Sequence, residues 1–217
     1  MTGIFSVFSG TPKTRTLSGR SARGFSLIEL MVAMAMACIV LAAIYSLHAA
    51  LMKSYTTQNA AADVQEAMRA GVDLMAEDIL MAGFDPTGAG VFGIQAADPI
   101  SIHFTSDRNM NGAIDGSDLE EIRYFWNGTQ LIQELYGDNT TDDVLVDNVT
   151  GLTFTYFDGG VAPSQLVPTF PATDLDAAQL AAIRTIEVSM TVQAPAGRDK
   201  PVERTYTTRF RVRNLDL

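Results

Sequence analysis

The chain has 217 residues, of which 47% are hydrophobic, and its formal net charge is −10. That length suits one globular domain with an additional segment, and the excess of acidic side chains argues against nucleic-acid binding, because phosphate contacts require Lys and Arg. The chain has a single cysteine, Cys38, which rules out an intramolecular disulfide. The globular part must therefore be held together by its core or by a metal ion.

Residues 1–24 contain four basic side chains and no acidic one, so we interpret them as a leader and not as part of the fold. The next fully charged residues are Glu29 and Lys53, and the residues between these two are almost all apolar. A helix of roughly 20 apolar residues crosses a hydrocarbon core, so we predict a transmembrane helix over 29–52. The basic residues that precede this segment place the leader in the cytoplasm and the C-terminal part outside it.

The helical pattern continues after Lys53 in a form compatible with water. Apolar residues recur every three or four positions and form one stripe, at Val64, Met68, Val72, Met75 and Ile79. Acidic residues such as Glu77 and Asp78 lie between them. Gly83 is a helix stop signal, and Asp85 and Pro86 follow it. We therefore predict one long helix over 25–83, with a membrane half and an amphipathic half that packs on a domain.

Beyond residue 83 the helical period gives way to short alternating segments, which are typical of strands. The predicted strands cover 100–104, 122–126, 131–135, 144–146, 152–157, 185–192 and 202–212, and a helical turn covers 177–182. The pair Asn127-Gly128 predicts a hairpin with a type I′ turn. The predicted fold class is α+β, in which the long helix packs on an antiparallel sheet formed by a β-rich domain over 84–217.

The segment GFSLIELM, residues 24–31, together with the basic leader resembles the type IV prepilin signal. In that family a membrane-bound prepilin peptidase cuts after the Gly, and the new N-terminal amine is methylated. The resemblance implies cleavage between Gly24 and Phe25 and methylation of Phe25. Removal of the leader would take the formal net charge from −10 to −14. An uncleaved signal anchor is the alternative that the residues leave open.

Three further stretches, residues 74–84, 144–156 and 183–192, are similar to PilW-type minor pilins. The resemblance implies a single-pass inner-membrane protein with a periplasmic C-terminal domain, which assembles with other minor and major pilins. It also implies a role in initiating a filament at or near its tip and a final location in the pilus at the cell surface. A J-type minor pseudopilin of type II secretion is the nearest alternative.

Glu29 is the fifth residue after the implied cut. Inside a filament an isolated buried carboxylate is strongly disfavoured. Pairing with the Phe25 amine of a neighbouring subunit would offset that cost and fix the axial register, so we expect an assembly role for Glu29. A simpler interpretation, in which the helix macrodipole favours an acid near the N-terminus, is compatible with this role.

Residues 107–118 have the oxygen spacing of an EF-hand-type calcium loop. Side-chain oxygens occur at positions 1, 3, 5, 9 and 12, from Asp107, Asn109, Asn111, Asp115 and Asp118. We predict that these residues and the Ala113 carbonyl bind Ca²⁺, that Gly112 permits the turn, and that Ile114 anchors the loop to the core. Position 12 is Asp118 instead of Glu, which is similar to dockerin loops. The alternative is an acidic, solvated turn between strands.

No catalytic constellation stands out in the sequence. His48 and His103 are far apart, and neither belongs to a Ser/His/Asp or Cys/His pattern. We therefore predict that the protein is not an enzyme, although a tethered enzyme with a convergent catalytic set is a competing class. A calcium-stabilised adhesive module displayed on a pilus is a third possibility, and it overlaps with the pilin prediction.

Overall fold

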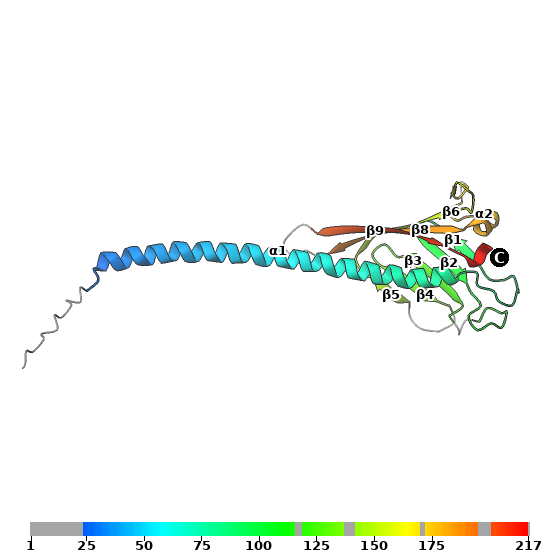
Figure 1. Cartoon of the computed structure of the whole chain (residues 1–217), viewed down its shortest axis with the longest axis horizontal. Coiled ribbons are helices and arrows are strands. Elements are labelled where there is room, and N and C mark those ends of the chain that lie inside the picture. Colours follow the sequence, from blue (N-terminus) through cyan, green and yellow to red (C-terminus); the bar gives the residue numbers. More distant parts are fainter. Residues whose placement is uncertain (1–23, 116–118, 137–141, 170–171, 195–200, 217) are drawn as a thin grey trace, which may run out of the picture. The chain divides into compact units, whose positions relative to one another are not determined.

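The computed structural model describes residues 24–115, 119–136, 142–169, 172–194 and 201–216. The chain divides into two compact units, Met1–Ala50 and Leu51–Leu217. Helix α1, Leu27–Met81, begins in the first unit and ends in the second (Figure 1). The strands that the structure describes all lie in the second unit.

Helix α1 has two different surroundings along its length. Every residue from 24 to 50 is exposed within this chain. In the second unit the predicted apolar stripe is confirmed, because Met68, Val72, Met75 and Ile79 are buried. The predicted stop signal is also confirmed. Gly83 adopts a φ of +74°, which favours glycine, and its N–H donates to the Thr105 carbonyl at 2.9 Å.

Among the residues that the structure describes, nine strands form two antiparallel sheets in the second unit. Figure 1 shows both sheets. The first sheet has the order β1-β2-β3-β4-β5, with strands Ile94–Ala97, Ser101–Thr105, Glu121–Trp126, Leu131–Leu135 and Asp143–Val146. The second sheet has the order β7-β6-β8-β9, with β6 at Val149–Phe157, β7 at Gln165–Leu166, β8 at Thr185–Ala194 and β9 at Val202–Arg211. Helix α2, Ala177–Ala182, and the 3₁₀ helix η1, Asn214–Asp216, complete the elements. The α+β class is confirmed.

Three details of the predicted strand pattern are wrong. The strands form two sheets and not one, and the short strands β1 and β7 were not predicted, because four and two residues are too few for a visible alternation. The predicted hairpin between β3 and β4 is present, but its turn is not the predicted type I′ turn. Trp126 pairs with Leu131, so the turn spans the four residues 127–130. Gly128 has a positive φ of +103°, whereas Asn127 is not among the residues with positive φ. Asn127 instead accepts the N–H of Gln130 through its side-chain oxygen at 2.8 Å.

The core lies between the two sheets and the buried face of α1. Side chains tie the sheets together: the Tyr156 hydroxyl donates to the Ser101 carbonyl at 2.9 Å, and the Trp126 indole N–H donates to the Val149 carbonyl at 3.1 Å. Helix α1 approaches the first sheet so closely that a Cβ added to Gly71 would lie 2.5 Å from Val146 Cγ2. A glycine at this position therefore permits the helix to contact β5.

Candidate functional site

The residues of the implied processing site lie at the start of α1. Phe25 is 84% exposed, and a Cβ added to Gly24 would meet no atom within 4 Å. The helix hydrogen bonding begins at the Ser26 carbonyl, which accepts the Leu30 N–H at 3.1 Å. Glu29 lies in the first turn and is exposed. The Gly24–Phe25 bond therefore precedes the helix, in an exposed segment outside regular secondary structure.

The N-terminal part of α1 is long and apolar enough to cross a membrane, by length and composition. Its large apolar side chains, such as Leu41 and Ile44, are more than half exposed within this chain. A soluble environment would leave this surface in water at a cost of about 25 cal/mol per Å². Lipid or the helices of other subunits remove that cost, so the segment is suited to membrane anchoring.

The acidic loop brings four of the predicted calcium ligands into one turn. Asp107 is fully buried, and its carboxylate accepts the N–H groups of Asn111 at 3.0 Å and Gly112 at 3.2 Å. The side-chain amides of Asn109 and Asn111 both donate to Asp115 Oδ2, at 3.2 and 2.5 Å. The Ala113 N–H donates to the side-chain oxygen of Asn111 at 2.7 Å. Asp118 lies outside the described residues.

Sequence reasoning missed Glu120 in this loop and misjudged Ile114. Ile114 is 39% exposed and does not belong to the core, so its predicted anchoring role is wrong. Strands and not helices flank this loop. Glu120 is fully buried, and its carboxylate accepts the N–H groups of Asn109 at 3.1 Å and Asp115 at 2.8 Å. Its signal in the sequence was an acid directly before a strand. Among the described residues, no three His, Cys, Asp or Glu side chains form a group that could hold a metal ion.

A buried polar network connects this loop to α1. The Arg108 guanidinium donates to Asp78 Oδ1 at 2.5 Å, and the hydroxyl of Tyr124 donates to Asp78 Oδ2 at 2.5 Å. The Gln133 amide donates to the same oxygen at 3.0 Å. Burial raises the pKa of Tyr124, and the negative charge of Asp78 raises it further. Asp78, which the sequence placed among the polar residues of the helix, is therefore a buried link between α1, β3, β4 and the loop.

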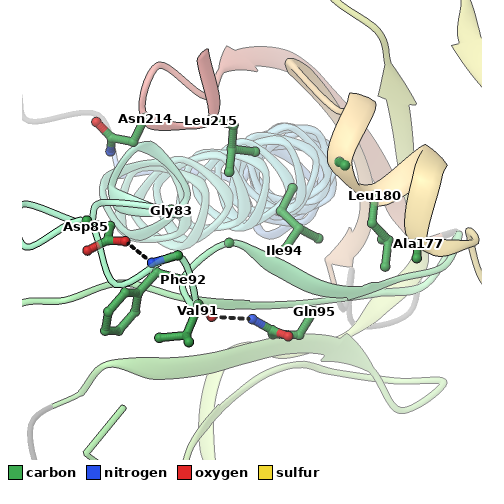
Figure 2. A pocket seen from close by; sticks show the side chains of 14 residues that line it. Gly83, Asp85, Val91, Phe92, Ile94, Gln95, Ala177, Leu180, Asn214 and Leu215 are labelled. Carbon is green, nitrogen blue, oxygen red and sulfur yellow. Dashed lines mark hydrogen bonds between the residues drawn. The ribbon is translucent and has the colours of Figure 1, made fainter. Parts of the chain in front are cut away.

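A hollow of about 780 Å³ lies at the C-terminal end of α1, between the segment after the helix, α2 and η1 (Figure 2). Asp85 lies at its rim (Figure 2). Its carboxylate accepts the Gly90 N–H at 2.7 Å and the Ala89 N–H at 3.1 Å. The Gly90 hydrogen bond lowers the pKa of Asp85. These bonds give Asp85 a structural role in folding the loop. Apolar Ile94, Leu180 and Leu215 share the lining with uncharged polar groups.

Comparison with known proteins points to the same N-terminal segment. The model of the prokaryotic N-terminal methylation motif matches residues 19–45, which include the implied cut, Glu29 and much of the apolar segment. No curated protein matches the chain. The motif supports a type IV pilin-like protein, that is, a pilin- or pseudopilin-type subunit. It implies processing by a prepilin peptidase and assembly with other pilins, and with the apolar helix it is consistent with membrane anchoring.

Proposed function

We propose that this chain is a minor pilin of a type IV pilus, similar to the PilW type, which helps to initiate assembly at or near the filament tip. The observation that carries the proposal is the single acid, Glu29, in the first turn of an exposed apolar helix that directly follows the implied cut. The matched methylation motif and the three PilW-like stretches support it. In this proposal the periplasmic domain reaches the cell surface as part of the pilus.

Glu29 acts in this proposal as an assembly residue. Within the part of the chain that the structure describes, the Glu29 carboxylate has no hydrogen-bond or ion-pair partner, so in this proposal its partner comes from a neighbouring subunit. The methylated Phe25 amine of that subunit is cationic. Both this amine and the Glu29 carboxylate must leave water when the helices pack together. Pairing offsets the desolvation of both charges.

The test compares Glu29→Ala and Glu29→Gln with the parent chain in a strain that makes only the variant. Membrane insertion should be unchanged, since both variants remove a charge from an apolar segment. The amount in the sheared filament fraction should fall by roughly 100-fold, because removal of one member of a buried charge pair costs about 3 kcal/mol or more. Unchanged incorporation of Glu29→Ala would refute the assembly role. A selective loss of protein secretion with normal piliation would favour the J-type pseudopilin.

We also propose that residues 107–118 bind Ca²⁺ and that the ion stabilises the displayed domain. Two fully buried carboxylates, Asp107 and Glu120, meet the same turn, and Asn109, Asn111 and Asp115 surround it. Oxygen donors of this kind suit a hard cation. A bound Ca²⁺ would supply positive charge to the buried carboxylates. This site would make the domain a calcium-stabilised module, whether it serves assembly or adhesion.

A thermal melt of the full chain in detergent tests the calcium proposal. At a hundredfold excess over the dissociation constant the ion adds about 2.7 kcal/mol, which corresponds to a rise in Tm of roughly 5–10 °C for a chain of this size. Asp115→Ala should abolish the difference between millimolar calcium and chelator, whereas Asp174→Ala, at an exposed acid elsewhere, should keep it. Identical midpoints for the parent in both buffers would overturn the proposal.

A further inference from the structure

Each of the two sheets ends in a strand that has one strand neighbour among the described residues. The first sheet has the edge strands β1 and β5, and the second has the edge strands β7 and β9. Of these, β5, which pairs with β4, and β9, which pairs with β8, share surface hollows with α1. An edge strand presents a row of backbone N–H and C=O groups that can pair with another strand. The two edges differ in length, because β9 has ten residues and β5 has four.

The β9 edge is basic. Arg204, Arg209 and Arg211 lie in the strand, Arg213 follows it, and all four are exposed; the strand also contains one exposed acid, Glu203. Arg209 contacts Glu187 at 2.5 Å and lies over the Phe157 ring at 4.7 Å, so its position is fixed by the second sheet. This concentration of arginine contrasts with the formal net charge of −10 for the whole chain.

The β5 edge is acidic. Asp142 and Asp143 lie at its start and Asp147 follows its end, and all three are exposed. Val144, between them, is 47% exposed. The sequence contains no Lys or Arg between Arg123 and Arg184, so these acids have no basic residue close to them in the sequence.

Helix α1 lies beside both edges and leaves a hollow at each. Leu80, which is 43% exposed, lines one hollow together with Arg209, Phe210, Arg211 and Arg213. Asp63 and Val64 of the helix line another hollow with Leu145 and Asp147 beside β5. A strand added at either edge could therefore pair with the backbone groups of that edge. Its side chains could enter the partly apolar hollow beside the helix.

We propose that the β9 edge of one copy of this chain pairs with the β5 edge of a second copy. The opposite charges of the two edges favour this pairing over β9 with β9 or β5 with β5, where like charges would face each other. The contact joins different surfaces of the two copies, so it leaves a free β9 and a free β5 at the ends and permits further copies to add. The inference rests on the proposed role as a filament subunit, and it names the surfaces through which the globular parts meet.

Cysteine crosslinking of the full chain in membranes tests this pairing. In a Cys38→Ala background, Thr207→Cys on β9 and Val144→Cys on β5 place one exposed thiol on each edge. A flexible bismaleimide should join them into a ladder of dimers, trimers and longer products. Chains with Thr207→Cys or Val144→Cys as the single thiol should not form dimers. Dimers of either single-thiol chain, or the lack of a ladder from the two-thiol chain, would overturn the pairing.

Charge reversal then tests the basis of the contact. Arg204→Glu with Arg213→Glu reverses the β9 edge without altering Arg209, and Asp142→Arg with Asp143→Arg reverses the β5 edge. Each reversal should reduce the ladder at least tenfold, and both reversals in one chain should restore it. Equal ladders from the parent and the singly reversed chains would refute opposite charge as the basis of the pairing and leave the filament role intact. An unaffected ladder, with the parent chain absent from the sheared filament fraction, would instead refute the filament role.

Discussion

The two halves of α1 differ in where their apolar side chains lie. Residues 27–50 expose all of theirs within this chain, whereas the helix beyond residue 51 buries one stripe against the sheets. Each half also contains one notable acid. Asp78 is met by Arg108, Tyr124 and Gln133, while the described residues offer Glu29 no comparable set of partners. The exposed surface of the first half is therefore suited to lipid or to other subunits, whereas the second half packs on residues of its own chain.

The largest effect expected in the second half comes from Asp78→Ala. It would leave the Arg108 guanidinium without its carboxylate and would cost about 3–5 kcal/mol of unfolding free energy, as for other buried ion pairs that lose one partner. Denaturant unfolding of the full chain in detergent, followed by the fluorescence of the single tryptophan, Trp126, measures it. The exposed neighbour Glu77→Ala should change stability by less than about 0.5 kcal/mol. Equal midpoints for the two variants would contradict the buried role of Asp78.

Met75→Ala compares the two halves directly. Met75 is fully buried, so truncation should cost about 2–5 kcal/mol in the same measurement. The matched change Leu41→Ala, at a residue that is 64% exposed in the first half, should leave domain unfolding unchanged. If Leu41→Ala destabilised the domain as much as Met75→Ala, the two halves would not be independent.

Gly71→Ala should produce a smaller loss. In an open helix this change would add about 1 kcal/mol of stability, but here the new Cβ would lie 2.5 Å from Val146 Cγ2. Overpacking of this kind costs about 1–3 kcal/mol. Val146→Ala in the same chain should relieve the overlap, so the double variant should be more stable than the sum of the two single changes predicts. Strict additivity would argue against a close contact between α1 and β5.

The parts of the fold that the sequence predicted are those with long local patterns. The apolar stripe of α1, the stop at Gly83 and the longer strands follow from periodicity within one segment. The division into two sheets did not follow, because it depends on which strands pair across long separations. The burial of Asp78 and Glu120 was hidden for the same reason: each looks like a surface acid until partners from distant segments surround it.

The candidate sites divide along similar lines. The processing site and Glu29 are defined by adjacent residues, so a motif sufficed to predict them. The calcium loop was predicted from its oxygen spacing, and the structure gathers Asp107, Asn109, Asn111 and Asp115, but the position of Ile114 depends on the flanking elements and was wrong. Spacing within a loop does not determine which side chain faces the core.

The identity of the first residue of the mature protein tests the central claim most directly. If the chain is a pilin- or pseudopilin-type subunit, mass spectrometry of the protein from native membranes should find Phe25 at the N-terminus, with a methyl group on its amine. The exposed Gly24–Phe25 bond before the first turn of α1 is the structural basis for this expectation. A mature protein that begins at Met1, or one cut beyond residue 45, would contradict the account.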